Sequence, residues 1–115
     1  VVRNNKDLAA TDVELQNFME RWSHINMIDN GFYSNQAVMF TKQLKNMMEL
    51  ARVITIGALN RNESRGSHYK PEFPDRNDTD FLKTTKAFWT KEGPRFEWED
   101  VDISHIQPVA RTYGK

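Results

Sequence analysis

The sequence contains no cysteine, which excludes disulfides, thiolate metal sites and a thiol nucleophile. Its 5 glycines stand singly, so it has no glycine-rich loop of the kind that cradles the phosphates of a dinucleotide. No apolar run reaches the roughly 20 residues that a membrane span needs, and we therefore expect no direct membrane insertion. The formal net charge is zero, which removes the general electrostatic case for binding nucleic acid.

Groups that could carry catalysis or bind a metal are also few. The histidines His24, His68 and His105 are far apart in the sequence and show none of the spacings typical of metal ligands, so we expect no metal site. Ser64 and Ser67 lie near His68, but no G-x-S-x-G motif surrounds either serine. Hydrogen bonding within a loop is therefore the favoured interpretation of these serines, ahead of nucleophilic catalysis.

The length sets the size of the fold. A chain of 115 residues forms one domain with a modest core, and 38% hydrophobic residues are enough for it to fold. It begins at Val1 without an initiator methionine. We expect residues 1–115 to be a single domain of a longer protein.

Two amphipathic helices are expected in the first half of the chain. Thr11 and Glu14 form a capping box, which predicts that the first helix starts at Thr11. Its apolar face consists of Leu15, Phe18, Met19, Trp22 and Ile25. Ser34 or Asn35 can cap the second helix. The apolar stripe of that helix consists of Val38, Phe40, Leu44, Met47, Met48, Ala51 and Ile54.

The second helix gains another apolar face beyond Met48. This face consists of Leu50, Val53, Ile56, Gly57 and Leu59. One partner helix cannot cover both faces, so we expect a surface outside this chain to cover the second one. In the isolated chain, Leu50, Val53 and Ile56 should then form an exposed patch.

The second half of the chain has no long helical pattern. Two prolines and several Asp and Asn residues predict an irregular segment over residues 63–80, and so long a loop should be held by contacts elsewhere. Residues 81–90 and 95–101 are rich in aromatic and β-branched side chains and predict a β-hairpin, although residues 82–85 could instead extend a helical turn begun at Asp78. Residues 103–115 should wrap a surface or stay mobile. The predicted fold is mainly α, an antiparallel helix pair or three-helix bundle with a small C-terminal β-hairpin.

The one local concentration of basic residues surrounds His68 and consists of Arg61, Arg65, Lys70 and Arg76. It could be a solvated loop, an anion site for a dicarboxylate or phosphate, or a clamp whose guanidinium groups bond across a domain boundary. Glu63 and Asp75 could neutralise much of its charge, which weakens the anion interpretation. We favour the clamp.

The string Glu63-Ser64-Arg65-Gly66, with His68 two residues later, resembles a signature of the C-terminal helical domain of succinate dehydrogenase and fumarate reductase flavoprotein subunits. The resemblance continues before it, through residues 40–47, and after it, through residues 73–78 and 81–85. Two positions depart from the family pattern, Ser67 in place of the usual alanine and Thr84 where many members have a histidine. The interdomain or structural motif that the resemblance and the basic cluster together indicate consists of Arg61, Glu63, Ser64, Arg65, Gly66, His68, Arg76 and Asp78.

The resemblance implies a non-catalytic domain that packs on the FAD-binding domain of the same subunit. The parent enzyme would oxidise succinate to fumarate and pass electrons through an iron–sulfur subunit to quinone, as a peripheral part of a respiratory complex on the cytoplasmic side of the membrane. The family's FAD-binding and substrate-binding groups lie upstream of the part resembled here. We therefore assign no catalytic, cofactor-binding or metal-binding residue, and we expect FAD to be bound by the parent protein and not by this chain.

Two alternatives remain. L-aspartate oxidase carries a similar string, but residues 73–78 and the aromatic hairpin favour the respiratory enzymes. A free-standing helical adaptor would also lack catalytic groups.

Overall fold

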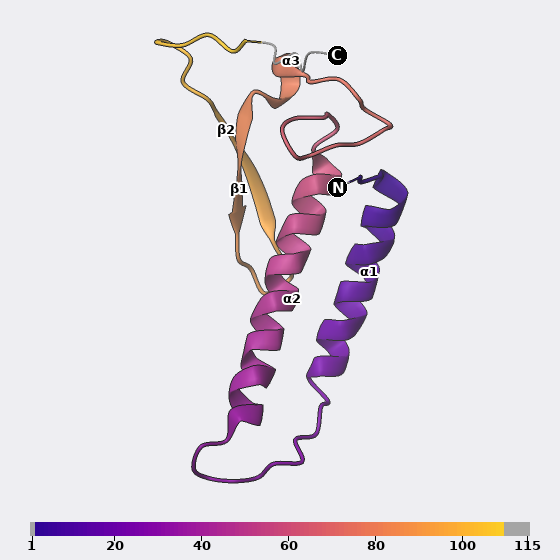
Figure 1. Ribbon diagram of the computed structural model, residues 1–115, viewed down its shortest axis with the longest axis vertical. Helices are drawn as coiled ribbons and strands as arrows, with labels where there is room; N and C mark the ends of the chain where they lie inside the picture. Colours follow the sequence, from indigo (N-terminus) through magenta and orange to yellow (C-terminus); the bar gives the residue numbers. More distant parts are fainter. Residues whose placement is uncertain (1, 110–115) are drawn as a thin grey trace.

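The computed structural model describes residues 2–109 as a pair of long antiparallel helices, a folded loop and a β-hairpin (Figure 1). The molecule is elongated, with extents of 57 × 31 × 31 Å. The central helix lies between the first helix and the hairpin (Figure 1). The elements are α1 (Asn5–Trp22), α2 (Gln36–Asn60), α3 (Asp78–Phe81), β1 (Lys83–Phe88) and β2 (Arg95–Asp100). The predicted fold class is confirmed in its helix-pair form.

α1 begins about two turns earlier than the capping box predicts. The side chain of Asn4 accepts a hydrogen bond from the backbone N–H of Asp7 at 2.8 Å and so caps the helix. The predicted start at Thr11 is wrong, because the intervening Lys-Asp-Leu-Ala-Ala stretch favours helix and Asn4 supplies an equally good cap before it. Thr11 Oγ1 instead donates to the carbonyl of Asp7 at 2.8 Å, as threonines inside helices do.

α2 is the spine of the domain, as predicted. Of the two candidate caps, Asn35 is the one used, because its side chain accepts from the backbone N–H of Val38 at 3.2 Å. The indole of Trp22 donates to the carbonyl of Thr41 at 3.0 Å and ties the two helices together near their connecting loop. Within residues 2–109, neither long helix combines the length and apolar composition that a membrane crossing requires.

The hairpin runs antiparallel in the register from Lys83↔Asp100 to Phe88↔Arg95. The helical turn that starts at Asp78 ends at Phe81. Residues 82–85, for which the sequence allowed either helix or strand, therefore belong mainly to β1. The ring of Phe96 approaches α2 closely at Gly57, where an added Cβ would lie 3.4 Å from it. The hairpin therefore packs directly on α2.

One arginine of α2 pairs with α1 and lies close to the hairpin turn. Arg52 on α2 forms an ion pair with Asp12 on α1, with Nε and Oδ1 2.8 Å apart. Gly93 in the turn has a φ of +131°, and a Cβ there would lie 3.1 Å from the Arg52 guanidinium. Glycine is required at this position because both its backbone conformation and the approach of Arg52 disfavour a side chain.

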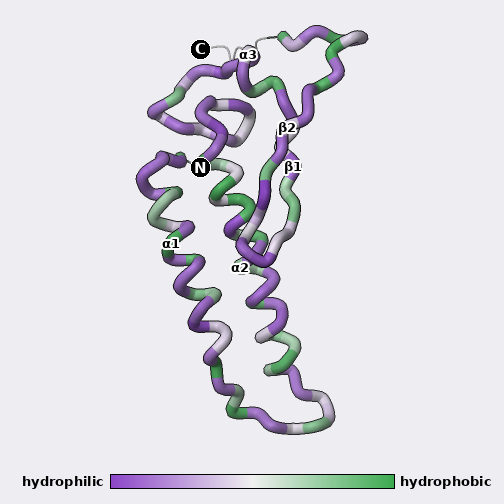
Figure 2. The backbone as a smooth tube through the Cα atoms, turned by 180° about the vertical axis from the view of Figure 1, so that it is seen from behind, coloured by the Kyte–Doolittle hydropathy of each residue, from purple (hydrophilic) through white to green (hydrophobic). Residues whose placement is uncertain are grey.

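The structure corrects the prediction about the two apolar faces of α2. Val53 and Ile56 of the second face are partly buried within this chain, Val53 beside the hairpin turn, so the expected exposure holds only for Leu50, which is 62% exposed. On the first stripe, α1 covers Met48, whereas Phe40, Met47 and Ile54 stay exposed. Figure 2 shows hydrophobic positions recurring along the whole of α2. Periodicity located the apolar positions but not the neighbour of each one.

The chain after β2 forms no helix or strand over residues 101–109. Two hydrogen bonds tie its ends to the rest of the described chain: the backbone N–H of Val101 donates to the carbonyl of Leu82 at 3.4 Å, and Arg76 Nη1 donates to the carbonyl of Val109 at 2.8 Å. The last part of the predicted wrapping or mobile tail, residues 110–115, lies outside the described residues.

Candidate functional site

A buried carboxylate organises the loop that follows α2. Glu63 has no exposed surface and accepts hydrogen bonds from Arg61 Nη1 at 2.5 Å, from Arg65 Nε at 2.9 Å and from the backbone N–H of Asn77 at 3.0 Å. Burial acts to raise the pKa of Glu63, but the bonds from Arg65, Asn77 and Arg61 outweigh it and hold the pKa below its usual 4.5. Glu63 is therefore ionised and fully bonded inside the chain.

A second carboxylate extends this group towards the surface. Asp78 accepts from Arg65 Nη2 at 2.6 Å and from Arg76 Nη2 at 2.7 Å, and its pKa is lowered, most of all by the hydrogen bond from Arg65. We call Arg61, Glu63, Arg65, Arg76 and Asp78 together the carboxylate cluster. The structure brings these predicted residues together, with Asp78 in place of Asp75 as the second partner of the arginines.

Arg61 connects the carboxylate cluster to the base of the hairpin. Its guanidinium donates to the carbonyls of Phe81 at 2.9 Å and Lys83 at 2.5 Å as well as to Glu63. It also lies over the rings of Phe81 and Trp98, 5.7 and 5.1 Å from their centroids. A single side chain thus joins the end of α2 to the start of β1.

The Arg-Gly-Ser-His stretch is a tight turn. The backbones of Arg65 and His68 exchange two hydrogen bonds, of 2.8 and 3.0 Å, around Gly66 and Ser67. Gly66 has a φ of +58°, and glycine is favoured at the first central position of such a turn because it has no Cβ. Ser67 is exposed, so a serine in place of the usual alanine is accommodated without disturbing the turn.

His68 closes the turn onto the end of α2. Its Nε2 lies 3.0 Å from the carbonyl of Arg61 and its Nδ1 lies 3.5 Å from Arg3 Nη1. Because a carbonyl only accepts, we assign the proton to Nε2. Burial lowers the pKa of His68 below its usual 6.5, and the charges of Arg3, Lys70 and Arg61 act in the same direction against the opposing effect of the Arg61 carbonyl. His68 is a neutral structural side chain here.

Lys70 is the residue whose role the sequence did not reveal. It is fully buried, and Nζ donates to Asn5 Oδ1 at 2.7 Å, to the carbonyl of Leu59 at 3.1 Å and to Asn62 Oδ1 at 3.1 Å. These bonds join α1, the last turn of α2 and the loop. The only signal in the sequence was the position of Lys70 within the basic concentration, and nothing there indicated burial.

Ser64 has the loop-bonding role predicted for it. Its Oγ accepts from the backbone N–H of Lys70 at 3.0 Å and donates to the carbonyl of Phe73 at 2.7 Å. At the start of α1, the backbone N–H of Asn5 donates to Glu72 at 2.8 Å. The long loop is therefore held from within this chain, across the upper ends of both helices (Figure 1), and not only by contacts elsewhere as its length suggested.

The geometry disfavours an anion site at the basic concentration. Arg61 and Arg65 already bond Glu63, and Lys70 is enclosed. Arg65 is 28% exposed, and its Nη1 bonds no other residue of the described chain. One nitrogen of Arg65 thus remains available for a contact outside the domain.

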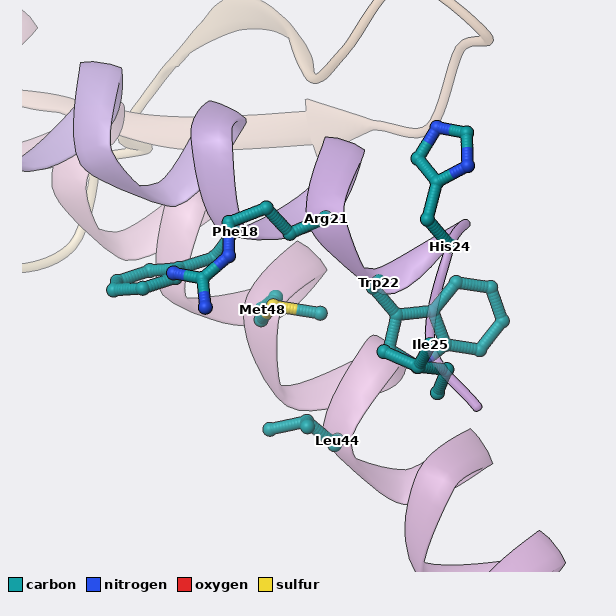
Figure 3. Close-up of a pocket in the computed structure, with 7 residues that line it drawn as sticks. All are labelled: Phe18, Arg21, Trp22, His24, Ile25, Leu44 and Met48. Atoms are coloured by element: carbon teal, nitrogen blue, oxygen red, sulfur yellow. The ribbon is translucent and has the colours of Figure 1, made fainter. Parts of the chain in front are cut away.

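A groove of about 680 Å³ opens between α1 and α2 near their connecting loop (Figure 3). Its walls are mainly apolar, with Arg21 and His24 as the only ionisable lining residues among Phe18, Trp22, Ile25, Leu44 and Met48. It has no convergent set of polar groups of the kind that orients a cofactor. No three His, Asp or Glu side chains of residues 2–109 converge in a way that could hold a metal ion.

Comparisons with known proteins place this arrangement in context. A family model described as "Fumarate reductase flavoprotein C-term" matches residues 1–113. The chain is 55% identical over 117 residues to a succinate dehydrogenase flavoprotein subunit of Bacillus subtilis (strain 168), covering 100% of this chain and 20% of that protein. It is 32% identical to a fumarate reductase flavoprotein subunit of Haemophilus influenzae, covering 99% of this chain and 19% of that protein.

The fold is shared as well. A solved chain of E. coli quinol fumarate reductase is similar to this structure with a TM-score of 0.92 at 30% identity, covering 100% of this chain and 20% of that chain. The present chain thus spans about a fifth of the length of the relatives it matches.

Proposed function

Because the chain belongs to the family of fumarate reductase flavoprotein C-terminal domains, we propose that it is the non-catalytic C-terminal domain of a succinate dehydrogenase flavoprotein subunit. The 55% identity over the whole chain to a succinate dehydrogenase subunit carries this proposal, since the match to a fumarate reductase subunit is 32%. The parent protein would oxidise succinate to fumarate.

The cofactor and the partners are part of the same proposal. FAD is bound by the preceding part of the subunit, and this domain packs on that FAD-binding domain. Electrons then pass to an iron–sulfur subunit and on to quinone, and the domain lies in a peripheral position on the cytoplasmic side of the membrane. The name of the E. coli relative, a quinol fumarate reductase, supports a quinone partner.

The alternatives are less well supported. The β-hairpin, present at residues 83–100, favours the respiratory enzymes over L-aspartate oxidase. The relatives are about five times longer than this chain, which favours a domain of a flavoprotein over a free-standing adaptor.

We expect the 115-residue chain to bind neither FAD nor succinate, whereas the full-length subunit carries FAD and oxidises succinate in its complex. The reason is that the arginines of the basic concentration are bonded to Glu63 and Asp78 of the chain itself, and no glycine-rich loop cradles a phosphate. Calorimetric titration of the chain and a succinate assay of the complex test this. Saturable binding to the chain at micromolar concentration, roughly 8 kcal/mol, would contradict the first part. Oxidation of L-aspartate by the full-length protein would favour the rival.

We further propose that the motif residues of the loop, including Arg65, Gly66 and His68, shape a contact with the FAD-binding domain. Arg65 supports this because its Nη1 is unbonded within the described chain and its side chain is partly exposed. The guanidinium could bond a carbonyl across the boundary while Nε and Nη2 hold Glu63.

Replacing Arg65 by glutamine in the full-length subunit should impair assembly more than chemistry. Leaving its partners unpaired costs about 1 to 3 kcal/mol, enough to lower the yield of flavin-loaded enzyme in the complex. Turnover per bound flavin should barely change. Arg95→Gln is the matched control, because Arg95 forms an exposed pair with Glu97. Normal flavin content with kcat/KM for succinate reduced a hundredfold would instead place Arg65 in the active site.

A further inference from the structure

α2 carries an apolar face that no part of the described chain covers. Phe40, Met47, Leu50 and Ile54 are spaced by seven, three and four residues, which places them on one side of the helix. Their side chains are 57, 65, 62 and 64% exposed. We call these four residues the α2 stripe.

The α2 stripe continues into a groove beside the hairpin. This groove, of about 700 Å³, lies between α2 and the hairpin turn, and Leu50 belongs both to the stripe and to the lining of the groove. Val53 and Phe88 contribute further apolar walls, and Trp89 at the end of β1 is 71% exposed. Contiguous apolar surface of this kind on a folded domain marks an interaction site, whereas single exposed apolar residues do not.

The composition of the α2 stripe favours a permanent partner. None of its four residues is charged, and the charged residues that line the groove are Lys45, Glu49, Arg52, Lys91 and Glu92. Permanent interfaces are the more apolar class, whereas transient ones resemble the rest of the surface. A helix with an apolar face that its own domain leaves open is normally buried in a larger body.

The larger body is the rest of the same polypeptide. The matched region is the C-terminal part of the family, and this chain covers 20% of its relative's length, so most of the subunit precedes it. A preceding domain of the same polypeptide is held near α2 at high effective concentration, which no separate partner shares.

We propose that the α2 stripe is the face on which the preceding part of the flavoprotein subunit docks, with an aliphatic or aromatic side chain of that part seated in the groove beside Val53 and Phe88. This inference rests on the proposed function and names the contact surface. It assigns the docking energy to the stripe, because the carboxylate cluster is bonded almost entirely within the domain.

Photocrosslinking in the full-length subunit tests the location. p-Benzoylphenylalanine replaces Met47 in one preparation and Val13 in another, because Val13 is an apolar residue of α1 with a similar exposure of 57%. We expect the probe at Met47 to crosslink to peptides that precede Val1 in the same polypeptide, and the probe at Val13 to give at least tenfold less of this product. Crosslinks from Met47 to a second copy or to another subunit, or no crosslink at all, would overturn the proposal.

A pair of substitutions tests the energetic role. Ile54→Lys in the full-length subunit should reduce the yield of folded, flavin-loaded protein at least tenfold, whereas Val13→Lys should leave it within twofold of the unmodified protein. Equal yields for the two variants would overturn the proposal. The proposed function and the docking proposal fail in different experiments. A complex that crosslinks as expected but does not oxidise succinate would support the docking face and contradict only the assigned reaction.

Discussion

Replacing Glu63 by alanine should destabilise the domain by about 3–5 kcal/mol, the cost of breaking a buried ion pair from one side. The substitution leaves Arg61 and Arg65 without their shared carboxylate and the backbone N–H of Asn77 without its acceptor. A domain of this size has roughly 5–15 kcal/mol of stability in total, so the loss is a large part of it. Chemical unfolding of the 115-residue chain measures the effect.

The control for this substitution is Glu97→Ala. Glu97 also pairs with an arginine, Arg95, but both side chains are about half exposed. Exposed pairs contribute about 0–1 kcal/mol, so the control should change the free energy of unfolding by less than 1 kcal/mol. Similar losses for both variants would contradict the central role of Glu63.

The pH dependence of stability provides a second measurement of the same group. The pKa of Glu63 is lower in the folded chain than its usual 4.5, so the unfolded chain binds the proton more readily. The stabilisation from Glu63 is therefore complete above pH 4.5 and is lost as the pH falls below 4.5 through the folded-state pKa. The Glu63→Ala variant should show a shallower loss of stability in that acid range than the unmodified chain.

The second large effect is expected for Arg61→Lys, which keeps the charge and removes the planar guanidinium. A lysine ammonium has its donors on a single nitrogen, so it cannot reproduce the spread of the guanidinium, in which Nη1 bonds Glu63 and the Phe81 carbonyl and Nη2 bonds the Lys83 carbonyl. It also lacks the planar group that lies over the rings of Phe81 and Trp98. We expect a loss of about 2–4 kcal/mol in the free energy of unfolding. The backbone amides of the hairpin should exchange hydrogen faster, because Arg61 joins the hairpin to α2.

Hydrogen exchange measured by mass spectrometry separates the hairpin from the helices. In the Arg61→Lys variant, protection should fall more over residues 83–100 than over α1. Arg95→Lys is the control, because Arg95 lies over a single ring, that of Phe88, at 4.6 Å and is 55% exposed. Unchanged protection of the hairpin in the Arg61→Lys variant would show that Phe96 and Trp98 hold it without Arg61.

Local features of the chain were determined by the sequence. Asn35 and the apolar period of α2 define one long helix, and the aromatic alternation around a Gly-Pro turn defines the hairpin. These signals are readable because capping, helix period and strand period depend on residues close together in the chain. The string around Arg65 and Gly66 also indicated the family, since it lies within a tight turn whose residue types are fixed by local geometry.

Tertiary structure alone decided which groups these elements bury. The ammonium of Lys70 donates a hydrogen bond to Asn5 at the start of α1, 65 residues away in the sequence. The positions of α1 and the hairpin determine which face of α2 stays exposed. Even the start of α1 was misplaced, because two competing caps, Asn4 and Thr11, differ little in local preference. The hydrophobic periodicity of the sequence shows which residues form an apolar face. Distant segments contribute the neighbour that covers each apolar residue and the partner of each buried charge. These contacts are therefore fixed only when the whole chain packs.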